Sequence, residues 1–294
     1  ATSTSRAGRT EGAPGMRLRL LPSSFPGSSP VGPTAGVPGS GRPAPRVAAQ
    51  PLTSFVVEGA GAGPLAVDAG SLGLVGEPAE MGRIAGLVLT HAHIDHVASL
   101  PMWVEALLSL DRAPVRVHAS AGAIEALRAH LFSGPLFPDF EALREADGRP
   151  LMEFVPFPEG APFELAGFQV SAFPVAHPVP THGLLVDDGE HALLFGADSG
   201  PCETLWQVAA RAPRLRAVVL EASFPERMQA IADSSGHLTP ATLAVDLERV
   251  PEGVRVLLAH LKPAYRREII AELSRRVGDA VEFLEPGAWV DLGQ

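Results

Sequence analysis

The sequence predicts an α/β protein in which two β-sheets pack face to face with helices on the outside. Two observations support this fold class. Short apolar runs, typical of buried strands, alternate with helix-forming stretches along the 294 residues. Several of these runs also end at a His, Asp or Glu, and chance placement explains five such ends poorly. The ends lie at residues 91–96, 177, 198, 221 and 260. We therefore expect these side chains to meet in space and to hold a pair of metal ions.

The composition limits the classes of protein to which the chain can belong. It carries a formal net charge of −10, and 46% of its 294 residues are hydrophobic, which allows one large domain or two small ones. The negative charge argues against a nucleic-acid polymer as the main partner, whereas bound cations would still attract a small anionic substrate. The single cysteine, Cys202, excludes an internal disulfide and a cysteine-based zinc site.

The chain also lacks the signals of a membrane or secreted protein. No apolar run is long enough to cross a bilayer, and the beginning has no basic end followed by an unbroken apolar core. We therefore expect a cytoplasmic protein with no membrane partner. The sequence leaves open whether the chain forms a homodimer.

The first fifty residues divide into a leader, a strand and a loop. Residues 1–15 show no periodicity, and we interpret them as a disordered leader or a cloning remnant that precedes a single domain over residues 16–294. Residues 16–21 alternate between polar and apolar side chains, as a first strand should. Residues 22–50 are rich in Pro, Gly and Ser and predict a long loop.

Two further strands, at 53–57 and 65–68, are joined by a glycine-rich turn at 59–63. That turn is not a phosphate-binding loop, because it lacks the Lys-Ser/Thr ending and no helix follows it. Asp68 ends the second strand just before the histidine-rich stretch. We expect Asp68 to orient a metal ligand rather than to bind metal itself.

Residues 87–96 carry the strongest chemical signal. An apolar run that predicts a buried strand leads into three histidines and an aspartate, and a helix-forming stretch follows. His91 and His93 are two apart, so they point the same way in an extended segment, while Asp95 and His96 fall where the chain turns. Imidazole and carboxylate are ligands of zinc and its first-row neighbours, and this many donors indicates two ions. A histidine-rich surface turn or a tag would rarely follow a hydrophobic strand.

The middle of the chain predicts a strand at 115–118, a helix at 121–131 and then an aromatic loop. Residues 129–140 are rich in Phe and in turn-forming residues. They are interpreted either as a loop packed over the core or as a wall whose rings hold a planar base. His118 and His130 are treated as structural or surface groups.

The later strands place isolated polar residues at their ends. These strands are predicted at 154–159, 168–175, 191–195, 215–220 and 254–259. His177 follows the second of them and is a candidate third ligand. Asp198 stands at an end where its two oxygens could bridge two cations, and Glu221 and His260 occupy two later ends. A helix is predicted to begin after Thr239, a capping residue that precedes proline.

Residues 91–96 resemble, in full, the His-x-His-x-Asp-His motif of the metallo-β-lactamase superfamily. Residues 132–140, 236–240 and 260–263 resemble the class II 3′,5′-cyclic-nucleotide phosphodiesterases within that superfamily. The resemblance covers about residues 16–290. It implies an αββα sandwich of two mixed sheets, in a single hydrolase domain with its site at one edge between the sheets.

The resemblance also implies a dinuclear metal centre. The implied ligands are His91, His93 and His177 for one ion and Asp95, His96 and His260 for the other, with Asp198 bridging. Two zinc ions are the first choice, and manganese or iron would accept the same ligands. The implied enzyme is a phosphodiesterase. A hydroxide bridging the two ions would hydrolyse 3′,5′-cyclic nucleotides, cyclic AMP first, to nucleoside 5′-monophosphates.

Hydrolysis of such a diester also needs an acid, because an alkoxide is a poor leaving group. His237 is the candidate, since no metal position is left for it, and Glu221 could hold its imidazole in one tautomer. The transfer-RNA 3′-processing nucleases, which the local sequence also resembles, contain a similar Glu–His pair. Asp95, His237 and Glu221 are thus the candidate catalytic residues. His237 and Lys262 are the candidate substrate-binding residues, with a solvated charge as the alternative for Lys262.

Several alternatives share this fold. Family members tend to have Asn and Trp where Ser133 and Phe137 stand, and a Ser near His182, which leaves the base preference open. A transfer-RNA 3′-nuclease is disfavoured by the acidic charge and by the lack of a Lys/Arg-rich insertion. A general phosphodiesterase, a phosphotriesterase, a thioesterase or a lactonase would use the same metal chemistry. A non-catalytic metal-binding scaffold would normally have lost a ligand, whereas every expected ligand is present.

Overall fold

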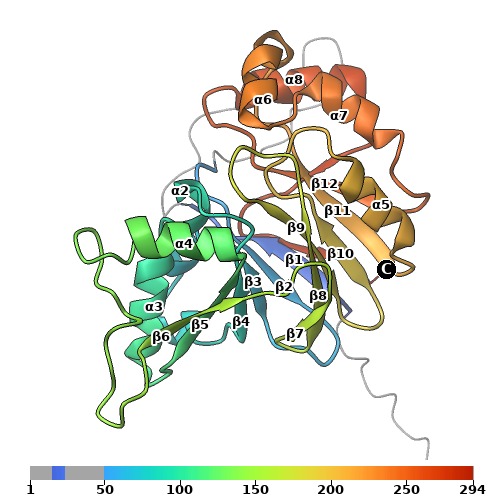
Figure 1. Ribbon diagram of the computed structural model, residues 1–294. Coiled ribbons are helices and arrows are strands. Elements are labelled where there is room, and N and C mark those ends of the chain that lie inside the picture. The colour runs from blue at the N-terminus through green and yellow to red at the C-terminus, as the bar shows by residue number, and fades with distance from the viewer. Residues whose placement is uncertain (1–14, 24–49, 294) are drawn as a thin grey trace, which may run out of the picture.

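The computed structural model describes residues 15–23 and 50–293, and two seven-stranded sheets form its centre (Figure 1). The first sheet contains β1 (Arg17–Leu20), β2 (Phe55–Glu58), β3 (Leu65–Val67), β4 (Gly86–Val88), β5 (Val115–Ala119), β6 (Met152–Pro156) and β14 (Trp289–Asp291). The second contains β7 (Phe163–Leu165), β8 (Phe168–Pro174), β9 (His182–Asp187), β10 (Ala192–Phe195), β11 (Leu215–Glu221), β12 (Arg255–Ala259) and β13 (Glu282–Phe283). Residues 1–14 of the expected leader at 1–15, and residues 24–49 of the predicted loop, lie outside the described residues.

Both sheets are mixed, as expected. Their strand orders are β14-β1-β2-β3-β4-β5-β6 and β13-β12-β11-β10-β9-β8-β7. Strands β3 to β6 run parallel to one another, and so do β10 to β13. The carboxyl ends of parallel neighbours reach the same edge of a sheet. Polar residues that follow β3, β4, β10, β11 and β12 are therefore brought to one side of the sandwich.

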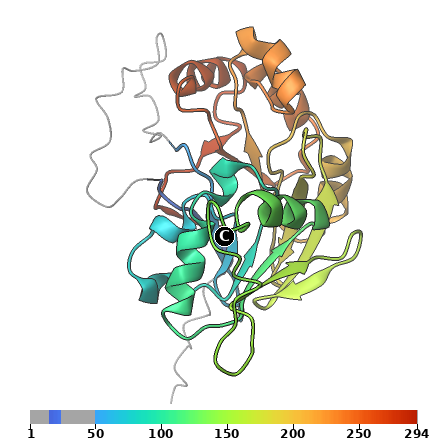
Figure 2. The ribbon, with the colours of Figure 1, turned by 60° about the vertical axis from the view of Figure 1, so that its left-hand side comes forward.

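Helices cover the outer faces of the two sheets (Figures 1 and 2). They are α1 (Pro78–Met81), α2 (Ile94–Val97), α3 (Leu100–Leu108), α4 (Ala121–His130), α5 (Glu203–Arg211), α6 (Gln229–Ser235), α7 (Pro240–Leu247) and α8 (Arg266–Arg276), with short 3₁₀ turns at Leu72–Leu74 and Glu226–Met228. Apolar residues of α3 and α4 pack on the first sheet, and those of α5, α7 and α8 pack on the second. The predicted sandwich of helix, sheet, sheet and helix layers is confirmed.

Strand β11 shows how the sequence builds two layers of core at once. Val219 points between the two sheets, whereas Val218 and Leu220 point toward the helices. Successive side chains of a strand face opposite ways, so a strand that is buried on both faces is an unbroken apolar run. This is why residues 215–220 carry no polar position apart from Arg216 at the exposed beginning.

Two predictions for the middle of the chain are refined by the structure. The strand expected at 154–159 is β6, which begins two residues earlier and ends at Pro156. Pro156 and Pro158 have no N–H group to donate, so only Phe157 between them can donate to β5, and it does so to the Ala119 carbonyl oxygen at 3.1 Å. The helix predicted to follow Thr239 is α7, and the Thr239 hydroxyl accepts a hydrogen bond from the Thr242 N–H.

The aromatic loop packs into the core instead of forming a wall at the surface. Phe132 and Phe140 are only 2% and 7% exposed. The ring of Phe137 lies edge-on to both, with centroid distances of 5.8 and 5.3 Å. Of the two interpretations of residues 129–140, the structure therefore favours the packed loop.

In the described part of the chain, no helix is long and apolar enough to cross a membrane.

Gly70 allows the chain after β3 to pass close to the turn that carries Asp95. A Cβ atom at Gly70 would lie 2.0 Å from the Asp95 carbonyl oxygen and 2.7 Å from the Thr53 nitrogen. Both obstacles are backbone, so Gly70→Ala should lower the free energy of unfolding by about 3 kcal/mol, the upper end for overpacking. Gly200→Ala is the control, because its nearest neighbours are 3.7 Å away. Denaturant unfolding would measure both, and an equal loss in the two variants would contradict this account.

Asp246 on α7 gives the fold a pH dependence of known sign. Burial raises the pKa of its carboxyl, although the Trp206 indole opposes this by donating a hydrogen bond. A raised pKa in the folded state means stability that is present at acid pH and is lost as the pH rises through that pKa. Asp246→Asn should therefore match the wild type near pH 4 and melt at a higher temperature at pH 8. A melting-temperature difference that shrinks with rising pH would contradict this.

Candidate metal centre and active site

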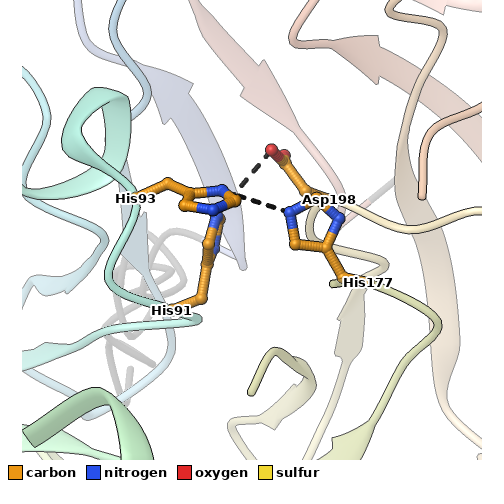
Figure 3. A group of neighbouring side chains, drawn as sticks. All are labelled: His91, His93, His177 and Asp198. Carbon is orange, nitrogen blue, oxygen red and sulfur yellow. Dashed lines mark hydrogen bonds and ion pairs between the residues drawn. The ribbon is translucent and has the colours of Figure 1, made fainter. Parts of the chain in front are cut away.

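The residues at the strand ends converge, and they form two groups that share Asp198. The first group is His91, His93, His177 and Asp198, and the second is Asp95, His96, Asp198 and His260. In each group, every residue offers one donor atom that lies within 4.8 Å of the others. Figure 3 shows the three imidazoles of the first group and the Asp198 carboxylate pointing toward one another.

The donors come from both sheets. His91 and His93 follow β4 and precede α2, which carries Asp95 and His96. The other three donors follow strands of the second sheet: His177 follows β8, Asp198 follows β10 and His260 follows β12. Each group therefore draws ligands from each side of the sandwich.

Left-handed backbone marks three of the strand ends. Asp68, Ala197 and His260 have φ angles of 62°, 54° and 51°, which residues other than glycine rarely adopt. Such conformations cost about 1–3 kcal/mol each and cluster at functional sites. In this protein they turn the chain abruptly where β3, β10 and β12 end. The side chains of His260 and of Asp198, next to Ala197, thereby reach the same space.

The histidines of the centre are held by their other ring nitrogen. His96 Nδ1 lies 2.7 Å from Asp68 Oδ2, and His91 Nδ1 lies 3.0 Å from the Thr90 hydroxyl. His177 Nδ1 lies 3.0 Å from the Gly236 carbonyl oxygen. Contacts of this kind fix the tautomer and the ring orientation of metal-binding histidines. Asp68 thus has the contact that an orienting residue needs.

The second nitrogens of two of these rings make the site suited to cations. His91 Nε2 and His96 Nε2 are both buried, and neither has a hydrogen-bond partner. Leaving a buried polar atom unpaired is costly, so native proteins rarely do it without a reason. Both atoms face Asp198, at 3.8 Å and 3.3 Å from its two carboxylate oxygens. Nitrogen and oxygen donors with free lone pairs around one centre fit divalent first-row metals.

The protonation states agree with this donor set for the first group. Burial lowers the pKa of His91 well below its ordinary value, and it also lowers those of His93 and His177. These rings are therefore neutral at physiological pH, which is the form that binds metal. For His96, burial acts in the same direction, but the flanking carboxylates of Asp198 and Asp68 outweigh it and raise the pKa. A cation would compete with that proton for Nε2.

A separate pair, His237 and Glu221, borders the centre. His237 Nδ1 lies 2.6 Å from Glu221 Oε1, and the same oxygen accepts a hydrogen bond from the Ser199 N–H at 3.1 Å. The His237 ring is 5.2 Å from that of His177 and 5.8 Å from that of His260. Burial would lower the pKa of His237, but the hydrogen bond that its imidazole donates to Glu221 raises it. The pair can therefore keep a protonated imidazole beside the metal groups.

Some residues of the site are not predicted from the sequence. Thr90 and Ser223 hold the rings of His91 and His260, each at 3.0 Å, yet a hydroxyl beside a strand end is too common to single out.

Lys262 joins neither metal group. Its ammonium lies 5.9 Å from the ring centroid of Phe224, which in turn contacts the His237 ring.

A family profile described as "Beta-lactamase superfamily domain" matches residues 68–261, which include nearly every strand end described above. The chain belongs to the beta-lactamase superfamily. It is 25% identical over 227 residues to "Probable 3′,5′-cyclic-nucleotide phosphodiesterase" from Yersinia pestis, a match that spans 67% of this chain and 64% of that protein. It is 31% identical over 227 residues to "Ribonuclease Z" from Mycobacterium marinum, which spans 71% and 77% of the two chains.

Solved structures of the superfamily share the fold. The crystal structure of unliganded yeast PDE1 superposes with a TM-score of 0.70 at 15% identity, covering 95% of this chain and all of that one. Such low identity carries the architecture and not the substrate. The chain therefore combines membership of this superfamily with the metallo-β-lactamase fold, and its relatives are named as a 3′,5′-cyclic-nucleotide phosphodiesterase and as ribonuclease Z.

Asp68 tests whether ring orientation matters for metal binding. Asp68→Asn keeps the shape of the side chain but removes the charge that faces His96 Nδ1. We expect metal affinity to fall about 10- to 100-fold, the usual effect of losing such a contact. Competition with a chromophoric chelator would measure it. Asp187→Asn, at a surface ion pair with Arg214, is the control that should bind metal normally. Equal affinity in the two variants would remove Asp68 from the centre.

Proposed function

We propose that this chain is a dinuclear-metal phosphodiesterase and that it hydrolyses 3′,5′-cyclic nucleotides, with cyclic AMP as the first candidate. The observation that carries the proposal is the combination of two donor groups sharing Asp198 with the Glu221–His237 pair at their border. The metal groups suit a phosphate, and the pair suits a leaving oxygen that needs a proton. The relative from Yersinia pestis supports the choice of substrate.

The proposed metal ligands are those of the two donor groups, and zinc is the first choice because imidazole and carboxylate suit it. When bound, two such cations supply Lewis acidity toward a phosphate oxygen and a nucleophile at neutral pH. Asp95 belongs to the second group and accepts a contact from His260 Nε2 at 3.1 Å. That contact lowers the pKa of the Asp95 carboxyl although burial opposes it, so Asp95 remains an anion.

The chain's own residues handle the proton. Cleavage of the bond between phosphorus and the 3′ oxygen leaves an alkoxide, which takes a proton from the imidazolium of His237. Glu221 fixes the donating tautomer through Nδ1, and Ser199 fixes Glu221 through its backbone N–H. Lys262 would add positive charge on the same side, because its ammonium lies against Phe224 next to His237. The product is the nucleoside 5′-monophosphate.

A transfer-RNA 3′-nuclease is the second candidate, because the Mycobacterium marinum relative is the more similar in identity. The net charge of −10 disfavours an RNA substrate, since RNA binding relies on neutralising many phosphates. A panel of cyclic AMP, cyclic GMP and a transfer-RNA precursor, each with and without chelator, separates the candidates. Chelator-sensitive cleavage of the precursor alone would overturn our first choice.

Replacing His237 tests its role as an acid. His237→Ala should lower turnover of cyclic AMP about 10²- to 10⁴-fold, the usual contribution of a general acid. Turnover of bis(p-nitrophenyl) phosphate should fall far less, because p-nitrophenolate leaves without a proton. Metal content, measured by atomic absorption, should be unchanged. Glu221→Gln should show a weaker form of the same pattern.

The two outcomes that would contradict this assignment are distinct. If His237→Ala loses metal, then His237 is a ligand and belongs with Glu221 and His260, which also form a compact donor group. If both substrates slow equally while the metal stays, then His237 does not protonate the leaving group.

A further inference from the structure

A cavity of about 350 Å³ lies on the outer face of the first sheet, where β14, β1 and β2 are neighbours. None of its lining residues belongs to the metal centre or to the Glu221–His237 pair. Its volume falls within the range of small-molecule sites, about 300–1,000 Å³. The cavity is therefore large enough for a ligand, and the proposed phosphodiesterase reaction does not account for it.

One side of the cavity is apolar. Val56 on β2, Leu72, Met81 and Ile84 line it, and each is less than 10% exposed. These four residues belong to the core cluster between the first sheet and its helices. The surface is thus rigid and continuous with the core, as a preformed binding site requires.

The other side of the cavity carries two arginine side chains beside Trp289. The guanidinium of Arg17 lies 4.3 Å from the centroid of the Trp289 ring, and that of Arg19 lies 5.8 Å from it. Arg17 is neutralised by Glu58, to which its Nε donates at 2.7 Å. Arg19 differs, because its Nε is buried without a hydrogen-bond partner and no acceptor contacts its guanidinium in the described ranges.

The charges of the cavity favour an anion. Arg83 also lines the cavity, and within residues 15–23 and 50–293 its side chain has no ion pair either. Glu80 is the one lining carboxylate besides the occupied Glu58. Two cations without a partner therefore face one free carboxylate in a protein whose net charge is −10. A guanidinium with a buried, unpaired Nε can form charge-assisted hydrogen bonds with an anion such as a carboxylate.

We propose that this cavity binds an amphipathic monoanion, a medium-chain aliphatic carboxylate. Its hydrocarbon chain lies along Val56, Leu72 and Met81, and its carboxylate accepts hydrogen bonds from Arg19. The apolar floor favours an aliphatic body, and the partner-free guanidinium beside Trp289 favours a single negative charge. This site is independent of the proposed phosphodiesterase activity.

Sodium octanoate is the probe, and the test uses the full-length, metal-loaded protein. Of the three tryptophans, Trp103 and Trp206 are 2% and 4% exposed, whereas Trp289 is partly exposed and lines the cavity. Octanoate should therefore change the tryptophan fluorescence in a saturable way, and calorimetry would confirm the stoichiometry of one. The neutral analogue 1-octanol should bind at least tenfold more weakly.

Three variants assign the binding to this cavity. Arg19→Gln should weaken octanoate binding about tenfold, the effect of losing one charge-assisted hydrogen bond. Arg211→Gln, an exposed arginine at the end of α5, is the matched control and should bind octanoate normally. Val75→Phe adds bulk at the lining of the cavity and should abolish binding while Arg19 stays in place.

Several results would overturn the proposal. One is the absence of saturable octanoate binding to the wild type. Another is equal binding of octanoate and 1-octanol, which would show that Arg19 recognises no charge. A third is unchanged binding in both Arg19→Gln and Val75→Phe, which would place the ligand elsewhere. Turnover of cyclic AMP by Arg19→Gln should equal that of the wild type, because the cavity lies apart from the metal centre.

Discussion

The buried carboxylate of Asp198 is the group around which the site is arranged. It is 2% exposed, and a charge at that depth is stable only when opposite charges or donors surround it. His260 and His96 approach one of its oxygens at 3.4 and 3.3 Å, and His91 approaches the other at 3.8 Å. Burial would raise the pKa of Asp198, but these imidazoles lower it well below its usual value. The carboxylate therefore remains an anion. Together with the surrounding imidazoles it provides oxygen and nitrogen donors that suit a cation.

The need to surround Asp198 explains the strain at the strand ends. His260 follows β12 with a left-handed backbone, and its imidazole lies 3.4 Å from the Asp198 carboxylate. Ser223 then secures the new direction, because its hydroxyl contacts both Nδ1 and the carbonyl oxygen of His260. The unfavourable backbone conformations at the strand ends thus allow the side chains around Asp198 to converge. The twelve parallel and antiparallel strand pairings behind these turns provide the rigidity that makes this convergence possible.

Sequence patterns predict the fold and the converging donors because both depend on short-range rules. A strand buried on both faces must be an apolar run, as at 215–220, and the polar residue that ends such a run must lie at a sheet edge. The strand β9 (His182–Asp187) escapes prediction, although its Leu184–Val186 run is apolar, because a glycine and two aspartates shorten the signal. Contacts between distant segments also escape. Nothing in the sequence indicates that the Gly236 carbonyl orients His177, and the composition of residues 129–140 does not decide between a packed loop and a surface wall.

The division of the donors between the two sheets has a mechanical consequence. Residues that follow β4 approach from one sheet, and those that follow β8, β10 and β12 approach from the other, so each group of ligands spans the seam of the sandwich. An ion bound in either group would link the two sheets across that seam, in addition to the apolar core between them and to hydrogen bonds such as that from the His182 N–H to the Thr90 carbonyl oxygen. Ligands that bind only the folded state shift the unfolding equilibrium in its favour. The supply of metal would then govern how much of the protein stays folded.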